Sequence, residues 1–260
     1  MLQLKNELYK SLTYILEDIP TNTQFIRSVL EGHVDGKIFV DREINPSSIY
    51  ICHKYGMTFL YGDSGNDLFN SQLAEYFRSI KQDEWIQTYP QAWDSFLRSL
   101  TESAGVEFYS RVNFAFDQKI FEKNTRHASF DNCTVQEATV DIMKNFNGKV
   151  VPKYFWKEFL LPSCKGYVAM VENEPASIAF SAYLHGSDLE IGIETAEKHR
   201  GSGLAFAACV ALIRYCIEKG MTPIWSCKLD NTASMKLAQR LGFVEIVRFP
   251  YYCIPAKDCE

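Results

Sequence analysis

Residues 189–205 constrain the fold of this chain more than any other segment. Residues 189–195 alternate in the manner of a β-strand, a polar loop follows, and Gly201-Ser202-Gly203 leads into a long apolar helical pattern that ends at Gly220. A helix that starts in this way exposes unpaired backbone N–H groups and the positive end of its dipole. Small residues let a diphosphate approach that backbone closely, and Arg200 adds a cation. The segment therefore predicts a strand–loop–helix unit that binds a diphosphate.

Two common diphosphate motifs do not match this unit. A dinucleotide-binding fingerprint places its first glycine directly after the strand, whereas residues 196–200 intervene here and its third small position falls on Phe206. A nucleoside-triphosphate loop requires Gly-Lys-Ser/Thr, which is absent from the segment. Neither a dinucleotide nor a nucleoside triphosphate is therefore the expected ligand.

The pattern along the rest of the chain predicts an alternation of helices and strands. Helices are expected at 1–32, 67–80, 92–101, 135–145, 204–219 and 232–241, and strands at 38–40, 48–52, 58–61, 107–115, 166–171, 176–183, 189–195, 221–227 and 243–248. The strands between 166 and 195 are joined by short turns and can form an antiparallel meander, whereas the crossover through helix 204–219 must be parallel. We expect an α/β (α+β) fold: a mixed, mostly antiparallel sheet with flanking helices, preceded by an N-terminal α/β domain.

The polar segment 116–132 marks the expected domain boundary, which gives domains of residues 1–125 and 126–260. The chain has 260 residues, a length that two ordinary domains can share.

Composition and charge exclude several functions. The net charge of −5 provides no basic footprint for nucleic acid, and no apolar run approaches the roughly 20 residues that span a membrane. The eight cysteines form no C-x-x-C pair and have no histidine at zinc-finger spacing, so free thiols are expected and no metal. We expect a cytoplasmic protein without nucleic-acid or membrane partners.

Three short motifs together resemble those of the GCN5-related N-acetyltransferases. They are Arg200-x-x-Gly203-x-Ala205, Asn231-x-x-Ser234 and Leu241-Gly242-Phe243, and the resemblance covers roughly residues 165–250. The whole chain also resembles a two-domain subgroup that includes the zwittermicin A resistance acetyltransferase, through residues 190–195, 200–205 and 225–227. In that light the N-terminal half is hypothesised to be a degenerate copy of the same fold that shapes the acceptor site, although no residue-level repeat is visible.

The resemblance implies that acetyl-CoA is the cofactor and that particular residues bind it. Its pantetheine arm would lie between diverging strands and pair with the backbone of Ile193 and Thr195. Its diphosphate would lie on the loop and first helical turn, and Asn231 and Ser234 would contact it further along. The implied cofactor-binding residues are Ile193, Thr195, Arg200, Gly201, Ser202, Gly203, Leu204, Ala205, Asn231 and Ser234. Asn231 is also a preferred helix N-cap, a role compatible with cofactor contact.

Glu190 and Glu194 are the candidate catalytic residues, in that order of preference. Strand alternation places both carboxylates on one face, where either could take a proton from the attacking amine. The alternative that both are merely solvated strand residues stays open. The N–H of Ile193 would stabilise the oxyanion. Many family members carry a tyrosine at the position of Ala238 as the general acid, so no general acid is carried over.

The expected function is transfer of acetyl from acetyl-CoA to an amine of a small molecule, by direct attack of the amine on the thioester. Two alternatives stay open: a non-catalytic acyl-CoA-binding sensor, and a protein or peptide N-acetyltransferase. A homodimer is compatible with the sequence, which does not decide the oligomeric state.

Overall fold

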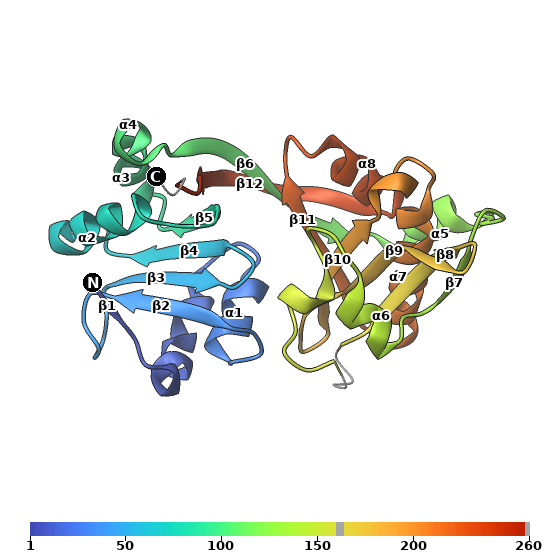
Figure 1. Cartoon of the computed structure of the whole chain (residues 1–260), viewed down its shortest axis with the longest axis horizontal. Coiled ribbons are helices and arrows are strands. Elements are labelled where there is room, and N and C mark those ends of the chain that lie inside the picture. The colour runs from blue at the N-terminus through green and yellow to red at the C-terminus, as the bar shows by residue number, and fades with distance from the viewer. Residues whose placement is uncertain (160–163, 258–260) are drawn as a thin grey trace. The chain divides into compact units, whose positions relative to one another are not determined.

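The structure, a computed structural model, describes residues 1–159 and 164–257 and divides the chain into two compact units. Unit 1 comprises Met1–Val112, Lys228–Asp230 and Arg248–Glu260, and unit 2 comprises Asn113–Cys227 and Asn231–Val247. Two strands pass from one unit to the other: β6 (Glu107–Phe116) begins in unit 1, and β12 (Phe243–Ile254) begins in unit 2 (Figure 1).

Unit 1 is built on strands β1 to β5. Its elements are β1 (Leu2–Gln3), the 3₁₀ helix η1 (Asn6–Glu17), α1 (Gln24–Leu30), β2 (Gly36–Val40), β3 (Ser48–His53), β4 (Met57–Gly62), α2 (Asp67–Phe77), β5 (Glu84–Tyr89), α3 (Trp93–Ser99) and α4 (Thr101–Ala104). Strands β1 to β4 are antiparallel, and β5 pairs with β4 in parallel after the α2 crossover. The end of β12 adds an antiparallel strand beside β5.

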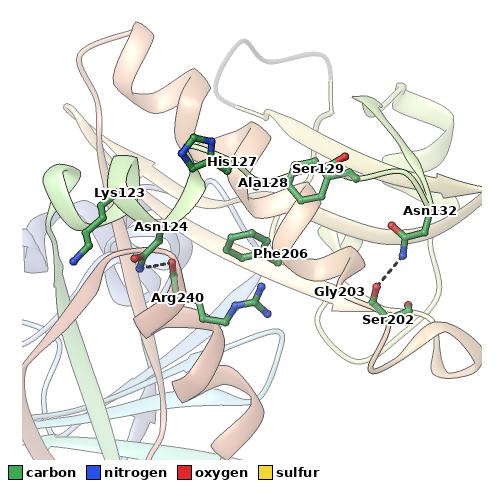
Figure 2. A pocket seen from close by; sticks show the side chains of 11 residues that line it. Lys123, Asn124, His127, Ala128, Ser129, Asn132, Ser202, Gly203, Phe206 and Arg240 are labelled. Atoms are coloured by element: carbon green, nitrogen blue, oxygen red, sulfur yellow. Dashed lines mark hydrogen bonds between the residues drawn. The ribbon is translucent and has the colours of Figure 1, made fainter.

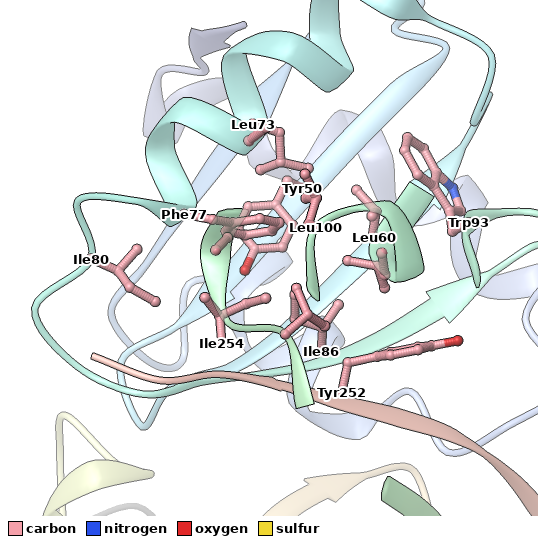
Figure 3. Close-up of a cluster of buried hydrophobic side chains, with 14 of the residues drawn as sticks. Tyr50, Leu60, Leu73, Phe77, Ile80, Ile86, Trp93, Leu100, Tyr252 and Ile254 are labelled. Carbon is pink, nitrogen blue, oxygen red and sulfur yellow. The ribbon is translucent and has the colours of Figure 1, made fainter. Parts of the chain in front are cut away.

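A core of buried aromatic and aliphatic side chains holds unit 1 together (Figure 3). Tyr252 and Ile254 from the end of β12 belong to it, as do Leu60 and Trp93. The Tyr252 hydroxyl donates to an Asp94 carboxylate oxygen at 2.7 Å, so the buried tyrosine has its polar atom satisfied. The last strand of the chain is therefore part of the first unit's core.

Unit 2 contains the predicted strand–loop–helix segment. Its elements are α5 (Gln118–Thr125), β7 (Thr134–Glu137), α6 (Val140–Asn145), the 3₁₀ helix η2 (Pro152–Tyr154), β8 (Gly166–Val171), β9 (Glu174–His185), β10 (Asp188–Thr195), the 3₁₀ helix η3 (Glu197–His199), α7 (Leu204–Glu218), β11 (Thr222–Lys228) and α8 (Thr232–Arg240). The strand order is β11-β10-β9-β8-β7, and only the β10–β11 pair is parallel. Helix α7 packs against β8, β9 and β10.

The predicted fold class is confirmed: the chain is mixed α/β with mostly antiparallel sheet pairing and flanking helices. Four element predictions need correction. Residues 134–137 form the edge strand β7 rather than the start of a helix, β5 was not predicted, and β12 extends to Ile254. The predicted first helix is two helices, η1 and α1, separated by a segment that contains Pro20. The sequence is rich in aromatic residues over 152–161, and residues 160–161 of this stretch lie outside the described residues.

Within residues 1–159 and 164–257, no helix is both long and apolar enough to cross a membrane. The seven cysteines in these ranges are free thiols, while Cys259 lies outside them.

Candidate active site

The glycine-rich loop has a backbone shape that only glycine adopts without strain. Gly201 and Gly203 have φ angles of +81° and +84°, and a Cβ on either would meet no atom within 4 Å. Positive φ, not crowding, therefore requires glycine at both positions, and the space beside them is open. Ser202 is held by the protein itself, because its Oγ donates to the His199 carbonyl and its own carbonyl accepts from Asn132 Nδ2 at 2.9 Å.

Helix α7 starts directly after this loop without a side-chain cap. Its N-cap residue is Gly203, and its first backbone bond is from Ala207 N to Gly203 O. Helix α8, by contrast, is capped by Asn231, whose Oδ1 accepts from Ser234 N at 3.1 Å. The predicted capping role of Asn231 is thus confirmed. The first turn of α7 keeps the donors and dipole that bind an anion.

Strands β10 and β11 pair only at their beginnings. The parallel register joins Asp188 with Thr222, Leu189 with Pro223 and Glu190 with Ile224, and it ends there, although β10 continues to Thr195 and β11 to Lys228. The strands therefore stop pairing with each other in the direction that leads to the Arg200–Gly203 loop and to the start of α8. Ile193 and Thr195, the predicted pantetheine contacts, lie on β10 beyond the last shared pair.

Glu190 lies at the last residue of this shared ladder. Its side chain is buried, with 7% relative exposure, and Oε1 accepts a hydrogen bond of 2.8 Å from the Ser226 hydroxyl. Burial excludes the alternative that Glu190 is a solvated strand residue. One carboxylate oxygen is thus bound by β11, at the point where pairing between the two strands stops.

Glu194 is also buried, at 8% relative exposure, but its carboxylate has more partners. Oε2 accepts from the backbone N–H groups of Lys149 at 2.7 Å and Val150 at 2.8 Å. Oε1 accepts from Arg200 Nη2 at 3.4 Å. Arg200 also donates from Nε to the Thr195 carbonyl at 3.3 Å. Glu194 thus connects β10, the segment before η2 and the cation of the loop.

The two carboxylates share one face of β10, as strand alternation predicted. Glu190 lies opposite Tyr183 in β9 and Glu194 lies opposite Ile178, two positions from Phe180. A register shift in this ladder brings Phe180 and Tyr183 to the same face, and both rings contact Phe155 with centroids 5.5 Å apart. The segment that carries Phe155 therefore covers the face of the sheet on which both glutamates lie.

The remaining predicted residues take mostly structural partners. Ser234 Oγ accepts from the indole Nε1 of buried Trp225 at 3.1 Å, and Thr195 Oγ1 bonds to Ser177 Oγ at 2.8 Å. Leu204 is buried, while Ala205 is half-buried at the start of α7. Ala238, at the position of the missing tyrosine, is fully buried.

A cavity of about 560 Å³ opens beside the loop, and the sequence did not reveal it. It is lined by Lys123, Asn124, His127, Ala128, Ser129, Phe130, Asn132, Ser202, Gly203, Phe206 and Arg240. None of these 11 residues is acidic. Figure 2 shows the Arg240 guanidinium beside the ring of Phe206, with 4.3 Å between its Cζ and the ring centroid. A basic cavity with an aromatic wall suits a phosphorylated nucleoside.

This cavity was missed because its parts are distant in sequence. Lys123 and His127 come from the segment that was interpreted only as a domain boundary, and Arg240 comes from the end of α8. The only sign of the cavity in the sequence was the basic character of Lys123, His127 and Arg240. Their proximity depends on the packing of α5 against the turn at Gly242. No group of three or more potential metal ligands occurs among the described residues.

Comparison with known proteins identifies the class to which this fold and site belong. The profile of the family described as GNAT acetyltransferase matches residues 15–252. An uncharacterized N-acetyltransferase of Bacillus subtilis (strain 168), YdfB, is 27% identical over 258 residues, covering 96% of this chain and 97% of that protein.

Solved structures share the fold. A GCN5-related N-acetyltransferase-like protein from Streptococcus suis 89/1591 has a TM-score of 0.70 at 23% identity, covering 95% of this chain and 98% of that one. A tandem GNAT protein from the clavulanic acid biosynthesis pathway has a TM-score of 0.58 at 10% identity, covering 98% of this chain and 95% of that one. The chain belongs to the GNAT acetyltransferase family and is an acyltransferase enzyme.

Proposed function

We propose that this acetyltransferase uses acetyl-CoA to acetylate an amine of a small molecule by direct attack on the thioester. The observation that carries the proposal is the end of the β10–β11 ladder at Glu190 and Ile224. Beyond it, the two strands share no ladder pair on the side that leads to the glycine loop, and Glu190 lies at the last pair. One chain segment thus combines a diphosphate loop, an unpaired strand edge for an extended ligand and a buried carboxylate.

The residues of the loop fit the cofactor. The open space beside Gly201 and Gly203 and the uncapped first turn of α7 suit a diphosphate, and Arg200 supplies a cation that is 59% exposed. The proposed backbone contacts are from Ile193 and Thr195 to the pantetheine amides, and from residues 201–205 to the diphosphate. Asn231 and Ser234, which already cap α8 and anchor Trp225, would shape the far side of the site.

The basic cavity beside the loop would receive the nucleoside end of the same cofactor. Ser202 and Gly203 belong both to the loop and to the cavity wall, so a ligand whose diphosphate lies on the loop reaches the cavity directly. Arg240 and Phe206 offer a guanidinium and an aromatic ring to a phosphorylated adenosine.

When bound, acetyl-CoA supplies an activated acetyl thioester. Glu190 would accept the proton that the amine must lose, because an amine with a lysine-like pKa near 10.4 is mostly protonated at neutral pH. The Ser226 hydroxyl orients this carboxylate, and the backbone N–H of Ile193 would donate to the developing oxyanion. Glu194, whose carboxylate already accepts from four backbone and side-chain donors, is the second candidate for the base.

A non-catalytic acyl-CoA sensor is the second candidate function. The observation that favours it is Ala238, which is fully buried at the position where many family members carry a tyrosine. The similarity to the zwittermicin A resistance subgroup stays a prediction and does not define the acceptor. Protein or peptide acetylation is distinguished from small-molecule acetylation by experiment.

Calorimetry with purified protein tests the cofactor assignment. We expect coenzyme A and acetyl-CoA to bind the wild-type chain, with dissociation constants in the roughly micromolar range that is usual for enzyme substrates. Absence of any heat of association with either ligand overturns the proposal.

Coenzyme A release from acetyl-CoA across a panel of amines then separates the functions. Turnover with small amines supports the proposal, and turnover only with basic peptides supports peptide acetylation. Tight binding without turnover on any acceptor supports the sensor.

A further inference from the structure

We propose that Glu194 is a positioning residue that couples cofactor binding to the segment covering the acceptor side of the site. This inference rests on the proposed use of acetyl-CoA. It concerns a connection inside unit 2: loop cation Arg200, carboxylate Glu194, and the backbone of residues 148–150.

The carboxylate of Glu194 is divided between two structural partners. Oε2 accepts from two successive backbone amides, Lys149 and Val150, at 2.7 and 2.8 Å. These charge-assisted bonds fix the segment as it approaches η2. Oε1 faces the other way, toward Arg200 Nη2 at 3.4 Å and the N–H of Thr195 at 3.3 Å. One rigid carboxylate therefore joins two parts of the chain that are about 50 residues apart.

Gly148 provides independent evidence that this contact is close. A Cβ at Gly148 would lie 2.4 Å from Glu194 Cγ and 2.6 Å from its Cδ, and the φ of Gly148 is +154°. Only glycine lets the backbone approach the glutamate side chain so closely, because any larger residue must displace one of them. Gly148 therefore allows the backbone of residues 148–150 to lie against the Glu194 side chain.

The segment held in this way lies over the face that carries the proposed base. It leads through η2 to Phe155, whose ring contacts Phe180 and Tyr183, and Tyr183 lies opposite Glu190. Trp156, the next residue, donates from its indole to the Ser181 carbonyl. An acceptor that approaches Glu190 from this face therefore meets the 148–156 segment.

Arg200 can bind the cofactor without releasing Glu194. A guanidinium has five N–H donors, and here Nε binds the Thr195 carbonyl while Nη2 binds Glu194, which leaves other donors for a diphosphate. A bound diphosphate fixes the guanidinium, and the guanidinium fixes Oε1. The backbone bonds to Oε2 then open less often, so cofactor binding orders the acceptor side before the amine arrives.

Hydrogen–deuterium exchange at the amides of Lys149 and Val150 tests this coupling. In the wild type, we expect saturating coenzyme A to slow their exchange roughly threefold or more, because local opening becomes less frequent. In free Arg200→Ala, these two amides should exchange about as slowly as in the free wild type. When coenzyme A is raised to a concentration that saturates this variant, their exchange should not slow further.

Lys198→Ala is the matched control. Lys198 is a cation of the same loop, and it pairs with Glu174 at 2.6 Å on the surface instead of with Glu194. This variant should keep the wild-type response. Gly148→Ala, which pushes against Glu194 from the other side, should abolish the response while leaving Arg200 in place, and its KM for the amine should rise more than its KM for acetyl-CoA.

Three outcomes keep the inference separate from the proposed function. If coenzyme A does not bind the wild type in calorimetry, the proposed function fails. If it binds but exchange at Lys149 and Val150 is unchanged, only the coupling is refuted. A full cofactor response in Arg200→Ala also refutes it, because the effect then reaches the segment by another route.

Discussion

Gly203 is the residue whose substitution should harm cofactor binding most directly. At φ +84° a valine is strained, and its branched side chain would project into the open space where we place the diphosphate. We expect Gly203→Val to raise the dissociation constant for acetyl-CoA roughly tenfold or more, which corresponds to a loss of only about 1.4 kcal/mol. Isothermal calorimetry measures the change.

Gly186, which also has a positive φ angle, is the matched control position. It has φ +58° in the turn between β9 and β10, and a Cβ there would also meet no atom within 4 Å. Both valine variants should lose about 1–2 kcal/mol of unfolding free energy. Only the Gly203 variant should lose affinity, and an equal loss in Gly186→Val means that the effect is general destabilisation.

Glu190→Gln tests the proposed base. The amide keeps an acceptor for Ser226 but cannot take a proton, so we expect kcat/KM to fall roughly 10²- to 10⁴-fold at neutral pH with acetyl-CoA affinity unchanged. The loss should shrink toward about pH 10, because the amine then loses its proton to solvent. Steady-state kinetics across this range provide the measurement.

The exposed glutamate Glu174, changed to Gln, is the matched control and should behave as wild type. A loss in Glu190→Gln that stays constant as the pH rises argues against a base and for a purely structural role.

Individual residues differ in how far the sequence could predict them. The glycines of the loop and the cap at Asn231 follow from local rules about φ and helix ends, and the structure bears out this local geometry. The partners of Glu194 do not follow, because Lys149 and Val150 are brought to it by tertiary packing. A buried carboxylate in a strand looks the same in sequence as an exposed one.

At the scale of elements, prediction succeeded where periodicity was long and failed at short or edge strands. Helix α7 and the β8–β10 meander carry strong apolar patterns and were predicted nearly to their ends. Strand β7 has four residues, all at least partly exposed, so nothing in its pattern distinguished it from the start of a helix. Strand β5 contains buried Glu84 and Gln87. Because both residues are polar, the sequence shows no apolar strand pattern there.

Strand β3 offers a test of how unit 1 responds to acid. Its last residue, His53, is 1% exposed, and burial, with the nearby charge of Lys54, lowers the pKa of its imidazole from 6.5 to about 3. The unfolded chain takes up this proton below about pH 6.5 while the folded chain does not, so unfolding free energy falls as the pH falls from 6.5 toward 3.

Between pH 7.5 and pH 4.5 the His53 contribution should lower the unfolding free energy by about 2–3 kcal/mol. In His53→Asn, whose amide oxygen can replace Nδ1 as the acceptor for the Tyr55 N–H, this part of the pH dependence should disappear. Urea unfolding of both proteins at the two pH values measures the difference. Identical pH dependences contradict a neutral buried imidazole.

At the scale of the whole molecule, the two units repeat one order of elements. Each has a short first strand, two helices and an antiparallel meander of three strands. A helical crossover to a parallel strand follows, and then one or two more helices and a last strand. The repeat lies in the order and direction of the elements, and no repeat of residues accompanies it. We infer that unit 1 is a second copy of the fold.

The copies differ at the two features that we assign to the cofactor. In unit 1 the parallel ladder runs from Met57–Trp85 to Tyr61–Tyr89, nearly the full length of both strands, so no strand edge opens. The loop before α2 satisfies its own donors, since Asp63 accepts from Gly65 N and Asn66 accepts from Phe69 N. Asp63 and Asp67 also give this helix start a negative charge that disfavours a diphosphate.

We therefore expect each chain to bind one molecule of acetyl-CoA, although both units have the same order of elements. Native mass spectrometry at rising cofactor concentration should show a single mass increment per chain, and in Gly203→Val this increment should need a roughly tenfold higher cofactor concentration to reach the same occupancy. A second increment that persists in Gly203→Val means that unit 1 has kept a site of its own. Because β4 and β5 stay paired almost to their ends, a site in unit 1 would require that ladder to open. Faster hydrogen exchange of the β4 and β5 amides on adding coenzyme A would indicate such opening, and unchanged exchange indicates that the ladder stays closed.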